Sequence, residues 1–379
     1  MTGLRFDLRE LPPSARALRA EVREFLAEAG KHWSPRVRAY SWMGFDRAFS
    51  EEVGRRGWIG MTWPKQYGGH ERSALERYVT LEEMLAVGAP VGAHWIGDRQ
   101  SGPLILRLGT EEQRREFLPR IARGELAFAI GLSEPDSGSD LASLRTRAEK
   151  VPGGWKVNGR KVWTTNAHRC DFAITLLRTS PSPDPRAKHQ GLSQILIDLK
   201  ASGITIRPIL DLAGEEGFNE ITFDDVFVPD SLLVGREGAG WEQATAELAF
   251  ERSGPERYLS SFPLLTATLD SLGGEPGAEE VVGRAVARAA TLRQMSLAVA
   301  GMLQDGKAPA REAALVKDIG NDYEQALPDR LRDALDPART PAEAQEMLAT
   351  MTMVARSYSL RGGTREILRG IIARQLGLR

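Results

Sequence analysis

The sequence lacks the features that mark secreted, membrane-spanning or strongly charged proteins. Its 379 residues include one cysteine, Cys170, which excludes an intramolecular disulfide and a cysteine-based metal cluster. No stretch approaches the roughly 18 apolar residues of a membrane-spanning helix, and the charged N-terminal segment is unlike a secretory signal. The 50 basic and 51 acidic side chains nearly cancel, which gives no reason to expect nucleic acid or an anionic membrane as a partner. We expect a soluble, cytoplasmic protein.

The sequence also has no recognisable metal-ligand pattern and few lysines. The five histidines are scattered without the spacing of a metal site, so no metal is expected. Only 9 lysines accompany 41 arginines, which we interpret as a compositional habit rather than as chemistry. The remaining composition, 42% hydrophobic and 27% charged, is ordinary for a folded protein, and the length predicts two or three domains.

Hydrophobic periodicity divides the chain into three parts of similar size. Residues 1–127 are expected to form an N-terminal helical domain, because apolar residues recur at helical spacing and Ser73 with Glu76 makes a capping-box pattern. Residues 128–236, where the period changes to two, are expected to form a middle β-barrel domain. Residues 237–379 return to helical spacing and are expected to form a C-terminal helical bundle.

The middle part contains several short strand patterns separated by Gly, Pro and Asp turns. The Asn158-Gly159 pair between two apolar stretches predicts a hairpin with a tight turn at that point. Further strands are expected at residues 172–177, 192–199, 204–209 and 220–228. This pattern favours a small barrel or sandwich over a parallel sheet. In the third part, helices are expected over residues 241–271, 277–305, 309–326, 341–358 and 364–376.

Two segments of the middle part have the composition of a cofactor site. Ile130–Asp140 is a loop of small hydroxyl residues with two glycines and a proline, and Lys161–Asn166 places a tryptophan beside two threonines and an asparagine. A flat heteroaromatic cofactor needs such an apolar face next to hydrogen-bonding groups. Taken singly, the first segment is more often a turn, and Trp163 is more often a core residue.

Together the two segments resemble the acyl-CoA dehydrogenase family, and matching tracts continue in order along almost the whole chain. These tracts are Trp63–Gly69, Gly109–Gln113 with Phe117–Pro119, Gly124-Glu125, Phe218–Glu220, Phe223–Pro229, and Gly363-Thr364 before Ile371–Arg374. The resemblance implies an N-terminal α-helical domain, a middle β-barrel and a C-terminal four-helix bundle, with FAD bound between barrel and bundle.

The resemblance also implies which residues form the site. Residues that match the family's flavin-binding positions are Ile130, Leu132, Ser133, Trp163, Thr165 and Thr364. Of these, Trp163 would lie against the flavin ring and the hydroxyl of Thr165 would bond near flavin N5. Ser139 matches a serine near the CoA arm of the substrate.

Desaturation of an acyl thioester needs a carboxylate that removes the α-proton while the β-hydrogen leaves as hydride to flavin N5. The family takes this base from one of two positions. At the first, directly before the Gly-Thr of the C-terminal motif, this chain has Gly362, whose backbone N–H is implied to polarise the thioester carbonyl. The second lies eleven residues after the glycine that opens the first bundle helix. Counted from Gly240 it is Glu251, followed by Arg252, which is implied to orient the base or the flavin side of the pocket.

Helical geometry favours Glu251 independently of the resemblance. The apolar residues within about 60° of it on a helical wheel are Ala244, Leu248, Pro255 and Phe262. Glu251 would therefore lie in an apolar stripe, where an unpaired charge is costly, and Pro255 is expected to kink the helix. Glu247, at the edge of the stripe, is the rival base, and an ion pair is the alternative role for Glu251.

Two motifs of the family are missing. Most members carry Arg-x-x-Phe-Gly and Gln-x-x-Gly-Gly, which hold the adenine half of a neighbouring subunit's FAD. The corresponding stretches here are Leu272–Ala278 and Leu327–Asp333. In this the chain resembles members that act on steroid side chains and form α2β2 tetramers, in which two different chains complete each site. We therefore hypothesise a second dehydrogenase-like subunit, with a homo-oligomer as the alternative.

The leading hypothesis is an FAD-dependent acyl-CoA dehydrogenase that makes a trans-2-enoyl-CoA and passes electrons to an electron-transferring flavoprotein. A short acyl-CoA oxidase and a non-catalytic subunit that completes a partner's site are the alternatives. Within the family, the loss of the C-terminal glutamate and the gain of Glu251 favour branched or ring-bearing acyl groups. A carrier-protein thioester in place of CoA stays open.

Overall fold

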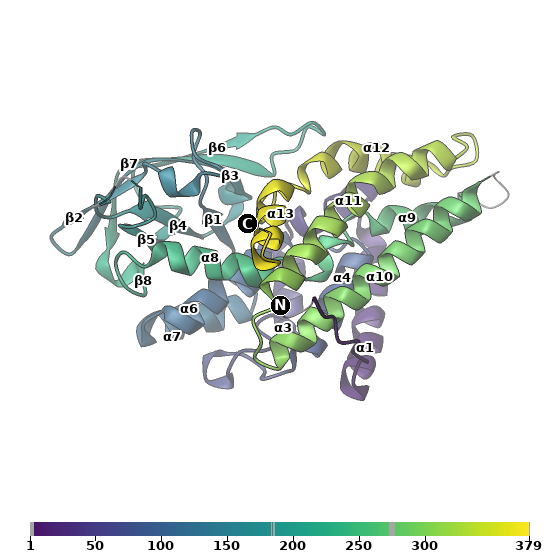
Figure 1. Ribbon diagram of the computed structural model, residues 1–379, viewed down its shortest axis with the longest axis horizontal. Coiled ribbons are helices and arrows are strands. Elements are labelled where there is room, and N and C mark those ends of the chain that lie inside the picture. The colour runs from purple at the N-terminus through teal and green to yellow at the C-terminus, as the bar shows by residue number, and fades with distance from the viewer. Residues whose placement is uncertain (1–3, 183, 185, 273–276, 379) are drawn as a thin grey trace. The chain divides into compact units, whose positions relative to one another are not determined.

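Helices occupy the first and last parts of the chain and strands the middle, which confirms the predicted fold class (Figure 1). The computed structural model describes residues 4–182, 184, 186–272 and 277–378, with the side chains of residues 247–251 also left out. By compactness the chain forms two units. The helical unit contains Met1–Gly44, Arg72–Val91 and Ala249–Arg379, and the sheet unit contains Phe45–Glu71 and Gly92–Leu248. The domain borders near residues 127 and 236 stay a prediction.

The helical unit is built from amphipathic helices that pack through their apolar faces. Its helices are α1 (Pro13–Ala29), α2 (Pro35–Tyr40), α4 (Ala74–Ala86), α9 (Phe262–Thr268), α10 (Ala278–Gln304), α11 (Ala310–Ala334), α12 (Ala342–Val354) and α13 (Arg365–Gln375). The long helices α10 and α11 run side by side (Figure 1). The capping box predicted at Ser73 and Glu76 is present at the start of α4, where it satisfies two backbone donors that the helix leaves free.

The single helix predicted over residues 241–271 is wrong. Helix α8 (Gly240–Glu251) ends at Glu251, a short 3-10 turn follows over Pro255–Arg257, and α9 begins at Phe262. Pro255 has no N–H for the carbonyl of residue 251, and a Cβ on Gly254 would lie 2.1 Å from the Glu256 carboxylate. The chain therefore breaks here instead of kinking. The apolar stripe drawn through Pro255 and Phe262 joins residues of three separate elements, so it does not support Glu251.

The sheet unit combines one mixed sheet with short helices. Its helices are α3 (Arg47–Arg55), α5 (Gly92–Ile96), α6 (Gly102–Leu108) and α7 (Glu111–Ala122), and α8 begins in it. Its strands are β1 (Phe128–Gly131), β2 (Arg147–Val151), β3 (Gly154–Thr165), β4 (Phe172–Arg178), β5 (Leu192–Asp198), β6 (Ile204–Ile209), β7 (Phe218–Pro229) and β8 (Leu233–Val234). The strand order is β6-β7-β3-β2-β4-β5-β8, with β1 parallel to β4.

The hairpin predicted at Asn158-Gly159 is wrong, because β3 runs through this pair as one strand. The turn lies earlier, at Pro152-Gly153, where Gly153 has the positive φ of 79° that the second central residue of a type II turn needs. Asn158 instead exchanges hydrogen bonds with Asp225 across a bulge in the β3–β7 pairing. The Asn-Gly chemistry of a tight turn therefore serves a β-bulge here.

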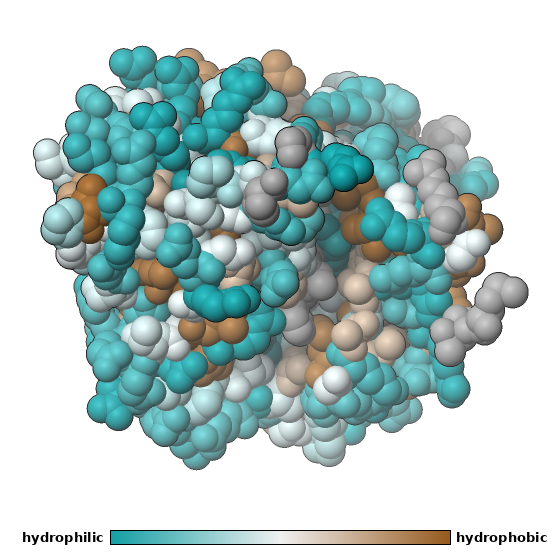
Figure 2. Space-filling view, turned by 60° about the vertical axis from the view of Figure 1, so that its left-hand side comes forward, coloured by the Kyte–Doolittle hydropathy of each residue, from teal (hydrophilic) through white to brown (hydrophobic). Residues whose placement is uncertain are grey.

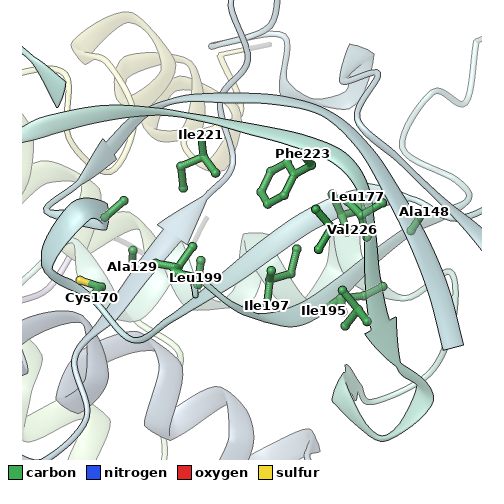
Figure 3. Packing of buried hydrophobic residues seen from close by; sticks show 14 of the residues in the cluster. Ala129, Ala148, Cys170, Leu177, Ile195, Ile197, Leu199, Ile221, Phe223 and Val226 are labelled. Carbon is green, nitrogen blue, oxygen red and sulfur yellow. The ribbon is translucent and has the colours of Figure 1, made fainter. Parts of the chain in front are cut away.

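The core of the sheet unit lies between strands that face each other across it. In Figure 3 the side chains of Ile221, Phe223 and Val226 on β7 point toward those of Ile195 and Ile197 on β5. All five are buried. This packing fixes which face of β3 and β7 points inward, and it leaves alternate residues of these strands on the outer face.

One face of the molecule is mainly polar (Figure 2). Hydrophilic residues predominate on the face shown in Figure 2, with hydrophobic residues scattered among them. In the part of the chain that the structure describes, no helix combines the length and the apolar character needed to cross a membrane.

Candidate functional site

The predicted site residues fall into two groups, one in each compact unit. The group in the sheet unit is Ile130, Leu132, Ser133, Ser139, Trp163 and Thr165. The group in the helical unit is Glu251, Arg252, Gly362 and Thr364. The side chain of the predicted base, Glu251, lies outside the described residues, so only its backbone position at the end of α8 is known.

Trp163 presents an aromatic surface to the outside of the sheet unit. Its side chain is 59% exposed, whereas Trp155 on the same strand is buried. Its φ of 59° lies in the left-handed region, within an irregularity of the β3–β7 pairing between Lys161 and Thr164. The ring of Phe218 stands edge-on to it, with centroids 6.2 Å apart. A bulky residue held in this backbone conformation is costly and is found mainly at functional sites.

The two predicted cofactor segments meet in the structure. The N–H of Val162 donates to the carbonyl of Ser133 at 2.9 Å, and the ammonium of Lys161 donates to the carbonyl of Leu132 at 3.0 Å. Ser133 and Thr165 are half-buried, which leaves their hydroxyls partly accessible. Ile130 is half-buried on β1, while Ser139 is exposed in the loop that follows.

A buried ion pair lies directly beneath these segments. Lys161 and Glu134 join at 2.8 Å, with their side chains 0% and 8% exposed. Burial lowers the pKa of Lys161 to about 8, an effect that the charge of Glu134 opposes. The pKa of Glu134 is lowered: burial opposes this shift, but the charge of Lys161 and hydrogen bonds from Lys161 and Thr146 outweigh it. Sequence analysis missed this pair, because a single lysine in a strand ordinarily faces solvent.

In the helical unit, Arg252 contacts the segment that contains Gly362. Its guanidinium is buried, and Nε donates to the Gly362 carbonyl at 3.1 Å. The residue that follows the predicted base is therefore in direct contact with the predicted carbonyl-polarising residue. Pattern matching placed these two positions in the same site, and the structure brings Arg252 and Gly362 together.

A second buried cation holds the next peptide of this segment. Lys317 on α11 is 0% exposed and donates to the Gly363 carbonyl at 2.7 Å. Arg361, just before the glycines, donates to Glu324 at 2.6 Å and to the carbonyl of Glu256 at 2.8 Å. Neither Lys317 nor Glu324 was predicted, since their partners lie 46 and 37 residues away in sequence.

These contacts orient the backbone of the glycine pair. Gly362 and Gly363 have φ values of 65° and 98°, which glycine adopts without a steric penalty. Because a trans peptide points its C=O and the following N–H in opposite directions, the N–H groups of Gly363 and Thr364 point away from the two cations. Among the described residues, none accepts a hydrogen bond from the N–H of Gly362, Gly363 or Thr364. Thr364 caps α13, with its hydroxyl accepting from the N–H of Ile367.

The sheet-unit group fits a flat heteroaromatic cofactor. Trp163 offers an exposed aromatic face, and Ser133 and Thr165 add hydroxyl and backbone groups beside it. The charged groups nearest to them, Lys161 and Glu134, are already paired with each other below the surface. Such a combination of an aromatic face and hydroxyl groups suits a flat heteroaromatic ring.

Comparison with known proteins agrees with this geometry. Residues 12–125 match the family model "Acyl-CoA dehydrogenase, N-terminal domain" and residues 129–226 match "Acyl-CoA dehydrogenase, middle domain". The acyl-CoA dehydrogenase IpdE1 of Mycobacterium tuberculosis is 33% identical over 345 residues, which cover 88% of each chain. For two further curated relatives, 37% and 32% identical, the aligned region covers 60% and 44% of their lengths.

Solved structures extend the similarity over the helical C-terminal part. The Tcur3481-Tcur3483 steroid ACAD is similar with a TM-score of 0.87 and 28% identity, covering 98% of both chains. The ChsE4-ChsE5 complex from Mycobacterium tuberculosis is similar with a TM-score of 0.84 and 30% identity, covering 98% of this chain and 99% of that one. On its sequence, its fold and the match along its length, the chain belongs to the acyl-CoA dehydrogenase family.

Proposed function

We propose that the protein is an FAD-dependent acyl-CoA dehydrogenase that desaturates the α,β bond of an acyl-CoA thioester. The contact between Arg252 and the Gly362 carbonyl carries this proposal, because it joins the segment of the proposed base to the segment of the proposed carbonyl-polarising N–H. The exposed Trp163, tied to the Ser133 loop, supports a flavin site in the other unit.

In this proposal Glu251 accepts the α-proton of the thioester. Loss of this proton places negative charge on the thioester oxygen, which backbone N–H donors stabilise. Arg252 and Lys317 hold the carbonyls of Gly362 and Gly363, so the two peptides that follow the proposed donor, the N–H of Gly362, are oriented before substrate binds. Such preorganised donors lower the barrier because they need no rearrangement during the reaction.

The flavin, when bound, would accept the two electrons that leave with the β-hydrogen. Ser133 and Leu132 would meet its ring through the loop, Trp163 would lie against it, and the hydroxyl of Thr165 would bond near its N5. Ile130 and Thr364 complete the proposed flavin-binding set, and Ser139 is proposed to lie near the CoA arm. An electron-transferring flavoprotein is the proposed electron acceptor.

We propose a bulky, ring-bearing acyl group as substrate and a second dehydrogenase-like chain as partner. The substrate proposal draws on the similarity to the Tcur3481-Tcur3483 steroid ACAD. The partner proposal draws on the ChsE4-ChsE5 complex and on the two family motifs that this sequence lacks. Where those motifs are expected, residues 327–333 lie within the continuous helix α11.

The decisive experiment compares two glutamate-to-glutamine substitutions on helix α8. In the chain assembled with a second dehydrogenase-like chain if FAD binding requires one, Glu251→Gln should retain FAD but slow flavin bleaching by saturated acyl-CoA by about 100-fold or more, which is a usual effect of removing a general base. Glu247→Gln, four residues earlier on α8, is the matched control and should change the bleaching rate by less than about threefold.

The opposite pattern would move the base to Glu247. Bleaching that survives both substitutions would overturn the proposed mechanism. Hydrogen peroxide formed in stoichiometric amounts during turnover would identify an oxidase instead of a dehydrogenase.

A further inference from the structure

Lysine is rare in this chain, and Lys161 occupies a position where a charged residue is costly. It lies on β3 in the sheet unit, its side chain is completely buried, and the chain otherwise uses mostly arginine as its cation. A buried ion pair adds little to stability compared with apolar residues of similar volume, so stability alone does not explain it. Its contacts indicate a different role.

The carboxylate of Glu134 is saturated with hydrogen bonds. It accepts from the Lys161 ammonium at 2.8 Å, from the N–H of Arg145 at 2.6 Å and from the N–H of Thr146 at 2.9 Å. The backbone of Glu134 also exchanges two hydrogen bonds with Ser137. Glu134 therefore links the start of the loop that begins at Leu132 to its end at Arg145 and Thr146.

The Lys161 ammonium connects this loop to the strand that carries Trp163. Besides Glu134 it binds the carbonyl of Leu132, the residue next to Ser133. On the neighbouring residue, the Val162 N–H binds the Ser133 carbonyl. These two parallel links come immediately before Trp163, whose backbone is in the left-handed region. They fix the loop and the bulge relative to each other at the point where Trp163 turns outward.

We propose that Lys161 and Glu134 form a positioning pair for the flavin: they hold the Leu132–Ser133 loop against the bulge of β3 so that Trp163 stays exposed to the isoalloxazine ring. The inference rests on the proposed FAD-dependent function. The compact ammonium suits this place, because it reaches a carboxylate and a carbonyl at once within a closed space.

The test measures FAD binding and flavin reduction potential in the full-length protein, together with its partner chain if FAD binding requires one. Lys161→Met and Glu134→Gln should each weaken FAD binding at least tenfold and shift the flavin reduction potential. Lys156→Met is the matched control: Lys156 lies on the same strand, but its ion pair with Asp225 is exposed. It should bind FAD within twofold of the wild type.

A double-mutant cycle with Trp163 distinguishes the positioning of Trp163 by the Lys161–Glu134 pair from general damage to the fold. If the pair acts through Trp163, then Trp163→Ala and Lys161→Met together should weaken FAD binding little more than Trp163→Ala alone. Circular dichroism and thermal unfolding identify variants that fail to fold. If Lys161→Met does not fold, FAD binding and the flavin reduction potential are measured on the nearly isosteric Glu134→Gln instead.

The outcomes distinguish this inference from the proposed function. Folded variants that bind FAD as tightly as the wild type, with the same potential, would overturn the positioning role alone. Additive effects in the Trp163 cycle would also overturn it. A wild-type protein that binds no FAD, alone or with a partner chain, would overturn the proposed function itself.

Discussion

At the scale of single residues, this protein uses buried charges to hold backbone. Lys161 and Lys317, both fully buried, each donate to the carbonyl of a residue in a predicted site segment, Leu132 in one unit and Gly363 in the other. A buried carbonyl without a donor costs free energy, so each lysine makes one backbone arrangement preferable to others. The same logic explains Arg252 at Gly362.

The decrease in unfolding free energy at low pH should depend on the charge of Glu134. Its pKa is lowered in the folded protein, because Lys161 and backbone N–H groups favour the carboxylate despite burial. A group with a depressed folded pKa stabilises the protein above its unfolded pKa, about 4.3 for glutamate, and this stability is lost as pH falls through the folded value. The wild type should therefore lose more unfolding free energy than Glu134→Gln below about pH 4.3, as urea titrations at several pH values would measure.

Glu149→Gln gives the control for this comparison, because Glu149 pairs with Arg147 on the surface of the same unit. Exposed ion pairs contribute little to stability, so the unfolding free energy of Glu149→Gln should fall at low pH in the same way as that of the wild type. If the unfolding free energies of the wild type and Glu134→Gln fell equally at low pH, the stability of the folded protein would not depend on the charge of Glu134.

At the scale of elements, the structure differs from the sequence prediction where one local residue pattern is compatible with two kinds of secondary structure. The strand at residues 204–209 and the capping box at Ser73 and Glu76 were predicted correctly, since both patterns depend on neighbours along the chain. Asn158-Gly159 has the chemistry of a hairpin turn, but its pairing with Asp225 makes it a bulge. The Lys161–Glu134 pair spans 27 residues, and the contact of Arg361 with Glu324 spans 37. Local patterns do not contain such contacts.

The bulge at Gly159 can be tested by adding one methyl group. Gly159 has a φ of 138°, and a Cβ there would lie 2.7 Å from the Cα of Thr146, the residue just before strand β2. Gly159→Ala should therefore lower the unfolding free energy by about 1–3 kcal/mol, the usual cost of a residue forced into a strained backbone region. Thermal or urea unfolding of the purified protein measures this change.

Gly283→Ala is the opposite case and controls for the substitution itself. Gly283 lies inside α10 with open space around its Cβ position. Alanine there should raise stability by about 0.5–1 kcal/mol, because glycine is a poor helix former. If Gly159→Ala were as stable as the wild type, the close approach to Thr146 would not be a constraint.

At the scale of the whole molecule, the sequence matches the family at the proposed flavin-ring positions but not at its adenine-binding motifs. The sheet unit has an exposed aromatic face with hydroxyl residues beside it, and the helical unit has a glycine segment whose carbonyls accept hydrogen bonds from buried cations. For the adenine half, the sequence lacks both of the family's motifs, and residues 327–333 lie within α11, which contains Pro328. We therefore expect this chain to bind the ring half of FAD more fully than the nucleotide half.

This inequality predicts how the protein should behave when it is purified. Expressed alone, the chain should be colourless or carry little FAD, because the contacts to the ring must offset the cost of ordering the whole cofactor. Expressed together with a second dehydrogenase-like chain that contributes the nucleotide contacts, it should be yellow and elute as a larger assembly. The flavin absorbance per polypeptide, measured on both preparations after gel filtration, gives the comparison. A chain that is yellow with stoichiometric FAD on its own would favour a homo-oligomer, and it would mean that residues outside the two family motifs hold the adenine.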